Sequence, residues 1–479
     1  MDEDFWYLVL RACQPLCMAI RLCGFEYEER QSMNQKKMDR LKMAGILGAG
    51  FLLRFFYVLF STIYDRQYDI GMIDLDAGHT VSGGHLAYIQ YIYENLRLPN
   101  IDPTSVYQFH HPPLHHFCCA IWMRFCSIFI HNTDVLEESI QMVPFICSLL
   151  ILLVILKILR QFDLREKTVC LLMLLFSFHP ALVLLSGSVN NDCMSLLFTL
   201  LCVYTTIRWS RKPNMRNIIY IALSISLGML TKQNVAEMAF PIAFVFIYMF
   251  VKQWRERGLP EKMIKQFALF GVVSVPIGMS FYVRNLILYK TPLIWVYTLP
   301  EDSWQYTGNV PVLNRFLWPV LSEMADNLLH FKIGCGYNVW MQIIRTSVLG
   351  EWDMMDVGRS VKVLAVLLMV AGAAMAFLAF IAFCKVFIIG KNTIDIPCRI
   401  IFVASYLVNL IFYLKFAYDY PHQCSMSFRY IEIELLFPAV ALGIIWQRSD
   451  KKWFQNGMIA LLAAFCLLSM AMIGVWCLG

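Results

Sequence analysis

Long uninterrupted runs of apolar residues constrain the fold of this chain more than any other feature of its sequence. Residues 43–63, 361–387 and 455–477 are each long enough to cross a hydrocarbon core about 30 Å thick as a helix. Of the 479 residues, 59% are hydrophobic and only 15% are charged. That is too little charge to cover the surface of a soluble protein of this length. The sequence therefore predicts an all-α integral membrane protein that lies in a lipid bilayer.

The distribution of Lys and Arg predicts which loops lie on the cytoplasmic side. Five strongly basic segments follow the first apolar run, and such segments collect in the cytoplasm. They are Lys157–Lys167, Arg208–Arg216, Lys252–Lys265, Gly390–Arg399 and Gln447–Lys452. All five become cytoplasmic if the chain has about eleven transmembrane helices. These are expected at 43–63, 140–159, 168–186, 192–208, 217–231, 236–252, 266–287, 361–388, 399–415, 427–446 and 455–477.

This topology divides the chain into a short N-terminal segment and one large membrane domain. Residues 1–42 are interpreted as a cytoplasmic amphipathic segment and residues 43–479 as the polytopic membrane domain. Two large outer loops follow, at 64–139 and 288–360. In the first loop we expect two interfacial helices, at His85–Arg97 and Leu114–Ile130. Leu114–Ile130 must not cross completely, because crossing would place the basic segment Lys157–Lys167 outside.

The first outer loop carries acidic residues that suit acid–base chemistry. Asp69 lies a few residues beyond the first span, and Asp74 and Asp76 follow it. A carboxylate held at the membrane surface can act as general base on a hydroxyl. Asp192, at the start of a later span, is a candidate for orienting the base or the acceptor. The alternative is an ordinary solvated loop with acidic residues of no catalytic role.

The segment HHPPLHH, residues 110–116, is the sharpest local pattern. The two prolines suit the first turn of a helix, which would place His111 and His115 four residues apart, at metal-ligand spacing. The interpretation we favour is simpler: the prolines begin the interfacial helix, and the histidines face headgroups or substrate. His111 is therefore a candidate substrate-binding residue, no metal ligands are predicted, and the need for a divalent metal is left open.

Charged residues recur where predicted spans meet the outer face. Charge at such depth is costly and is usually paired or functional. Four cations at one level suggest an anion such as a phosphate in a shared cavity, because Arg offers a bidentate fork. Snorkelling of each side chain to the interface is the alternative. The candidate substrate-binding residues are Lys232, Arg284, Arg345, Arg429 and the acidic Glu351. Lys232, Arg345 and Arg429 are expected to converge on one cavity, with Arg284 the weaker candidate.

The order of these features resembles a known superfamily. A long first outer loop opens with Asp, a helix begins at Pro112-Pro113-Leu114, a short Thr231-Lys232 turn follows, and Arg429 comes late. This resembles the GT-C membrane glycosyltransferases, in particular bacterial relatives of dolichyl-phosphate-mannose protein mannosyltransferases and lipid A aminoarabinose transferases. The resemblance covers roughly residues 43–446. It departs from the pattern at Asp69-Ile70, where many relatives have an Asp-Glu pair, so Asp74 and Asp76 stay candidates for the base beside Asp69.

The resemblance implies an inverting glycosyltransferase that moves a hexose from a polyprenyl-phosphate donor to an acceptor hydroxyl. The acceptor would be a glycan, a lipid or a protein. The expected location is a bacterial plasma membrane, with the active site on the outer side and a role in the cell envelope. A transporter or flippase of a lipid-linked anion and a membrane acyltransferase are the alternatives. The first would show inverted repeats, and none is apparent. Nucleic acid is excluded as a partner, because there is no basic patch with interleaved aromatic residues.

Overall fold

A computed structural model describes residues 32–63, 83–317, 329, 335–354, 356–390 and 394–478. Within these ranges the chain folds into helices, and a helix overlaps each of the eleven predicted spans. These helices are α2 (Ser32–Phe60), α6 (Met142–Leu159), α7 (Glu166–Phe178) with α8 (Pro180–Leu184), α9 (Asp192–Arg211), α10 (Met215–Met229), α11 (Ala239–Arg257), α12 (Glu261–Tyr289), α16 (Arg359–Phe383), α17 (Ile396–Asp419), α18 (Leu436–Arg448) and α19 (Lys452–Leu478). The prediction of an all-α membrane fold is confirmed.

The helices differ in whether they are long enough to cross a membrane. Among the described residues, 8 helices are long and apolar enough to cross a membrane, or up to 9 if the bent pair α7–α8 counts as one span. The helices α10 and α18 have only 15 and 13 residues. Both are shorter than the approximately 20 residues that a complete crossing needs. The count of eleven therefore stays a prediction.

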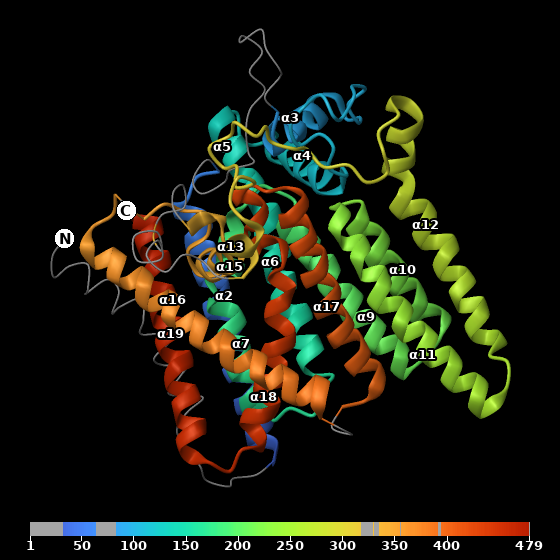
Figure 1. Cartoon of the computed structure of the whole chain (residues 1–479), viewed down its shortest axis with the longest axis vertical. Helices are drawn as coiled ribbons and strands as arrows, with labels where there is room; N and C mark the ends of the chain where they lie inside the picture. Colours follow the sequence, from blue (N-terminus) through green and yellow to red (C-terminus); the bar gives the residue numbers. More distant parts are fainter. Residues whose placement is uncertain are drawn as a thin grey trace.

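Short helices cover one end of the bundle. Figure 1 shows α3 (His85–Asn95), α4 (Leu114–Cys126) and α5 (Thr133–Glu138) there, beside the chain that leaves α12. The 13 residues of α4 reach only about 20 Å, so this helix does not span. Two groups attach it: Arg124 Nε donates to the Tyr93 carbonyl at 2.7 Å, and the Leu114 amide donates to the Leu230 carbonyl at 2.8 Å. The α4 helix thus links α3 to the end of α10.

A bend of 58° separates α7 from α8 and creates polar backbone groups inside the bundle. Pro180 begins α8 and has no amide to donate, so carbonyls at the end of α7 lose their helical partners. Arg54 of α2, with none of its surface exposed, supplies the missing donors. Its guanidinium donates to the carbonyls of Ser177 at 2.7 Å and Phe176 at 3.2 Å, and to Ser148 Oγ at 2.7 Å. Its charge is thus surrounded by acceptors, and the bend is stabilised.

Replacing Arg54 with Met is expected to lower the free energy of unfolding by about 2–4 kcal/mol, because buried carbonyls lose their donors. Thermal unfolding of the detergent-solubilised protein measures this. Arg124→Met is the matched control, because Arg124 also donates to two carbonyls but is exposed; its loss should cost about 1 kcal/mol or less. Equal effects of the two substitutions would contradict the structural role of Arg54.

Candidate active site

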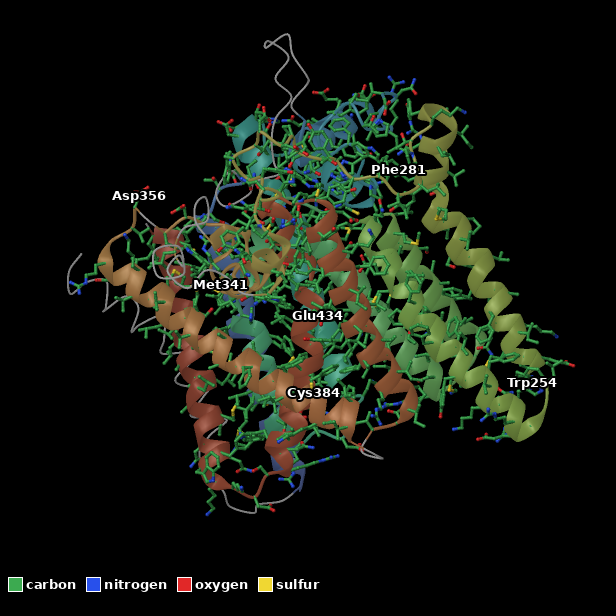
Figure 2. The ribbon with its side chains drawn as sticks, in the orientation of Figure 1. Trp254, Phe281, Met341, Asp356, Cys384 and Glu434 are labelled. Atoms are coloured by element: carbon green, nitrogen blue, oxygen red, sulfur yellow. The ribbon has the colours of Figure 1, made fainter. Side chains whose placement is uncertain are left out.

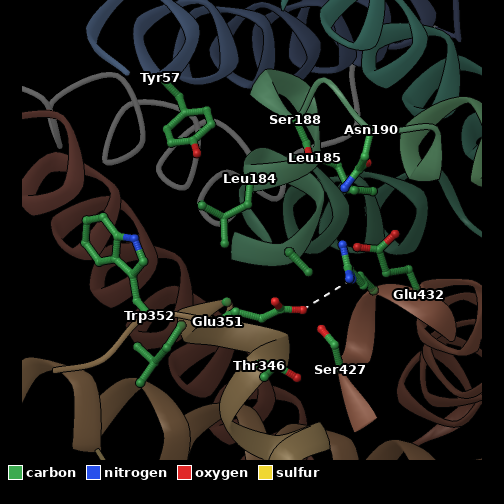
Figure 3. Close-up of a pocket in the computed structure, with 14 residues that line it drawn as sticks. Tyr57, Leu184, Leu185, Ser188, Asn190, Thr346, Glu351, Trp352, Ser427 and Glu432 are labelled. Atoms are coloured by element: carbon green, nitrogen blue, oxygen red, sulfur yellow. Dashed lines mark ion pairs between the residues drawn. The ribbon is translucent and has the colours of Figure 1, made fainter. Parts of the chain in front are cut away.

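A polar cavity lies where several chain segments meet (Figure 3). Its empty volume is about 640 Å³, counting the part that is open to the surface. Residues from α2, from the turn between α8 and α9, from the end of α15 (Val339–Leu349) and from the segment before α18 form its wall. They are Tyr57, Ala181, Leu184, Leu185, Ser188, Asn190, Thr346, Leu349, Gly350, Glu351, Trp352, Ser427, Arg429 and Glu432. The polar cavity thus combines aromatic, amide, hydroxyl and charged side chains.

A row of alternating charges runs from this wall into the bundle. It consists of Glu351, Arg429, Asp192 and Lys232, and we call it the ion chain. Lys232 contacts Asp192 Oδ1, and Arg429 Nη1 lies 3.7 Å from Asp192 Oδ2. On its other side, Arg429 Nε lies 3.2 Å from Glu351 Oε1. Asp192 is only 4% exposed, so its charge depends on these partners. The fold therefore brings together four residues that are up to 237 positions apart, from Asp192 to Arg429.

Local structure explains why these side chains meet. Asp192 is the first residue of α9, where a carboxylate is favoured by the positive end of the helix. Lys232 precedes the 3-10 helix Gln233–Met238, and its ammonium also lies 4.7 Å from the centre of the Tyr430 ring. Arg429 lies in the short helix Phe428–Tyr430, whose first amide donates to Thr346 Oγ1 at 2.8 Å. That bond attaches the Arg429 segment to α15.

The other predicted cations have different partners. Arg345 of α15 donates to the carbonyl of Trp352, so it supports the turn that carries Glu351. Of the three cations expected to converge on one cavity, Arg429 lines the polar cavity, and Arg345 and Lys232 are not among its lining residues. Arg284 donates to the Pro99 carbonyl at 2.8 Å and to Asn285 Oδ1 at 3.0 Å, which attaches α12 to the segment after α3. The structure thus brings Lys232 and Arg429 together on Asp192, whereas Arg345 and Arg284 have contacts elsewhere.

The ion chain changes the interpretation of the two cations. The sequence suggested a phosphate held in a cavity that the Lys and Arg side chains share. Instead, both cations contact carboxylates, and a third carboxylate, Glu432, lines the same cavity. A phosphate inside the cavity would face Glu351 and Glu432. Uncharged hydroxyl groups suit the cavity better, because they can both donate and accept hydrogen bonds.

A cluster of histidines from α3 and the start of α4 lies near the ion chain. His85 Nδ1 is 2.9 Å from His116 Nε2, and the rings of His85 and His111 stack with centres 5.3 Å apart. Burial and neighbouring histidines hold the pKa values of His85 and His111 well below the usual range, and Lys232 lowers both further. These rings are therefore neutral at pH 7. Among the described residues, no group of three His, Cys, Asp or Glu side chains is arranged to hold a metal ion.

His115 gives the cluster a measurable pH dependence. Its Nε2–H donates to the Val189 carbonyl at 2.7 Å, and burial lowers its pKa from 6.5 to about 4. The unfolded chain then binds this proton at higher pH than the folded chain. The contribution of His115 to the free energy of unfolding is therefore fully present above pH 6.5. It is lost as the pH falls to 4, and the loss is on the order of 3 kcal/mol.

We expect His115→Gln to reduce the drop in unfolding temperature between pH 7 and pH 4. Gln keeps an amide donor for Val189 but does not titrate. Thermal unfolding at a series of pH values is the measurement, and His131→Gln, at an exposed histidine, is the control. An unchanged pH profile in His115→Gln would show that other groups cause the acid sensitivity.

The candidate bases Asp69, Asp74 and Asp76 lie outside the described residues, so their catalytic role stays a prediction. Asp192 is described, and both of its carboxylate oxygens face cations. This suits an orienting role better than proton transfer. Sequence reasoning missed Glu432, Asn190, Tyr57 and Trp352. The signal for Glu432 was present, because it is an acidic residue inside a predicted span.

Comparison with known proteins supports the sequence-based resemblance. Residues 110–279 match the profile of the family "Dolichyl-phosphate-mannose-protein mannosyltransferase". This range contains His111, Asp192 and Lys232 but neither Glu351 nor Arg429. No curated protein matches the chain.

Solved structures match the chain at low sequence identity. The oligosaccharyltransferase of Archaeoglobus fulgidus, tethered to an acceptor peptide with the sequon NVT, is 14% identical, with a TM-score of 0.51. The match covers 90% of this chain but 55% of that protein, so the chain spans about half of its length. ArnT from Cupriavidus metallidurans bound to undecaprenyl phosphate is 14% identical over 90% of this chain and 77% of that one, with a TM-score of 0.38. The match to the oligosaccharyltransferase shows a shared fold, and the family profile over residues 110–279 supports the resemblance to GT-C membrane glycosyltransferases.

Proposed function

We propose that this chain, which shares its fold with an oligosaccharyltransferase, is an inverting glycosyltransferase that acts on the outer face of the membrane. It would move a hexose from a polyprenyl-phosphate donor to the hydroxyl of a glycan, lipid or protein acceptor. The observation that carries this proposal is the polar cavity, bordered by the ion chain, near the helices α3 and α4. The family description supports the donor class, because it names a dolichyl-phosphate-linked sugar.

The chemistry needs one base and little else. A carboxylate of the first outer loop, with Asp69 ranked before Asp74 and Asp76, would take the acceptor hydroxyl proton as that oxygen attacks the anomeric carbon. The bond from this carbon to the phosphate oxygen breaks, and its electron pair leaves with the polyprenyl phosphate. Phosphate is a good leaving group and needs no acid. A single displacement from the opposite face inverts the anomeric configuration.

Lys232 and the histidine cluster are the groups best placed to meet the donor phosphate. Lys232 contributes to the lowered pKa values of His85 and His111, so the ammonium and the neutral rings are neighbours. Neutral imidazole can donate a hydrogen bond to phosphate without adding charge to a cavity that already contains ion pairs. Arg429 and Glu351 would then lie on the sugar side.

The experiment is a transfer assay with the full chain in liposomes, a labelled polyprenyl-phosphate hexose and acceptor extracts of membrane glycan, lipid and protein. We expect polyprenyl phosphate to be released and the sugar to appear on one acceptor with inverted configuration, measured by NMR. Arg429→Gln serves as the inactive control. Movement of the intact donor across the bilayer without cleavage would contradict the proposal and favour the flippase alternative.

A further inference from the structure

Glu432 is a buried acid whose hydrogen bonding is incomplete. It belongs to the short helix Glu432–Leu435 before α18, lines the polar cavity and is only 6% exposed. Its Oε2 atom has no hydrogen-bond partner among the described residues. Figure 3 shows Asn190 and Glu432 on one side of the cavity, and Tyr57 and Trp352 on the other. A residue in a cavity wall that has a buried polar atom without a partner is a candidate for binding a ligand.

The charges around Glu432 indicate which form of the acid is present. Lys232 and Arg429 are matched in number by Asp192 and Glu351, which they contact. An ionised Glu432 would be a third carboxylate, buried and with one oxygen lacking a donor, which costs several kcal/mol. The neutral acid avoids this cost and can both donate and accept a hydrogen bond.

Apart from the paired Arg429 and Glu351, the rest of the wall is uncharged and suits a sugar ring. Asn190 Oδ1 accepts from the Asp192 amide at 3.1 Å, so its amide group faces the cavity (Figure 3). The ring of Trp352 is fixed by Trp476, with ring centres 5.5 Å apart and planes at 80°. An aromatic face on one side and neutral donors and acceptors on the other suit the apolar and the hydroxyl faces of a pyranose.

We propose that the polar cavity binds the ring of an uncharged hexose and that Glu432, as a neutral acid, recognises its hydroxyl groups. This inference rests on the proposed function and adds the substrate class and a specificity-determining residue. The ammonium of an amino sugar would be unpaired beside a neutral Glu432, or would require this buried acid to ionise. A uronic acid would place a further carboxylate beside Glu351 and Glu432.

The test uses three polyprenyl-phosphate donors, carrying a hexose, an amino hexose and a hexuronic acid, with the wild type, Glu432→Gln and Glu432→Ala. We expect the wild type to prefer the hexose by at least about tenfold in kcat/KM. Glu432→Gln keeps a neutral donor and acceptor, so its KM should stay within about threefold. Glu432→Ala should raise KM by about 10–100-fold with little change in kcat, as expected for the loss of one or two hydrogen bonds to the ring.

Glu434 provides the matched control. It lies two residues further along, is 9% exposed, and neither carboxylate oxygen has a hydrogen-bond partner among the described residues. It does not line the cavity and lies among the central helices (Figure 2). Glu434→Gln should therefore leave KM and donor preference unchanged, whatever it does to stability.

Deoxyhexose donors separate recognition from folding. Removing the hydroxyl that Glu432 binds should raise KM in the wild type and have no further effect in Glu432→Ala. The inference is overturned if no deoxyhexose donor has a raised KM in the wild type. It is also overturned if Glu432→Gln raises KM as much as Glu432→Ala while the amino hexose is the preferred donor. Donor binding, followed by the shift in unfolding temperature, distinguishes the two proposals. If donor binding depends on Glu432 but the donor is not cleaved, the transferase proposal is contradicted and the sugar site is supported. If sugar transfer occurs but does not depend on Glu432, the transferase is supported and the sugar site is contradicted.

Discussion

Asp69→Asn is expected to lower the rate of sugar transfer by about two to four orders of magnitude, the usual effect of removing a general base. Asn has nearly the same shape as Asp but cannot take the acceptor proton. Folding and donor binding should therefore be close to those of the wild type. Single-turnover transfer from a polyprenyl-phosphate hexose measures the loss, and the shift in unfolding temperature with donor measures binding.

Asp74→Asn and Asp76→Asn are the comparison variants, because both residues belong to the same predicted outer loop. If one of them is inactive and Asp69→Asn is not, the ranking is wrong and the mechanism remains. If all three variants transfer sugar normally, there is no base in the first loop, and the main chemical support for a glycosyltransferase is lost.

Arg429→Gln should lower turnover by at least about 100-fold and also destabilise the protein by about 3–5 kcal/mol. Arg429 is the only member of the ion chain that contacts two carboxylates, Asp192 and Glu351. Removing Arg429 leaves the largely buried carboxylates of Asp192 and Glu351 with Lys232 as the remaining cation of the ion chain. Thermal unfolding and the transfer assay measure the two effects separately.

The double variant Arg429→Gln/Glu351→Gln tests the cause. It restores equal numbers of cations and carboxylates in the ion chain, so about 1–3 kcal/mol of the lost stability should return. Activity should not return, because the guanidinium is still missing from the cavity wall. Additive losses of stability in the double variant would show that Arg429 and Glu351 are not coupled in the folded protein.

The positions of the membrane helices were predictable because each follows from a local property, a run of apolar residues between basic segments. Helix lengths were less predictable. The predicted span 168–186 contains a 58° bend, for which Pro180 was the only local signal. The predicted span 427–446 begins as short 3-10 helices, and α18 starts only at Leu436. Those first residues form part of the cavity wall, so packing at the site overrides the apolar pattern.

The candidate site was predictable only in part, because it depends on which helix ends meet. Asp192, Lys232, Glu351 and Arg429 were each identified by charge at a membrane boundary, and the structure joins them. Their pairing with one another was not foreseen, since sequence spacing contains no information on contacts between distant segments. Arg345 had the same local signal but donates to a backbone carbonyl instead. A charged residue near a membrane boundary can therefore serve the fold as well as a ligand.

The hydrogen bonds of Arg54 also constrain how the protein is made. Its acceptors Ser148, Phe176 and Ser177 follow it by 94, 122 and 123 residues. When the first span leaves the ribosome, none of these three groups has been synthesised, and Arg54 has the Gly50 carbonyl of its own helix as an acceptor. An Arg near the centre of a helix costs about 2.5–3.5 kcal/mol on insertion. We therefore expect this span to remain beside the translocation machinery, or at the membrane surface, until α7 and α8 arrive. Complete integration of the first helix would then be a late event in biosynthesis.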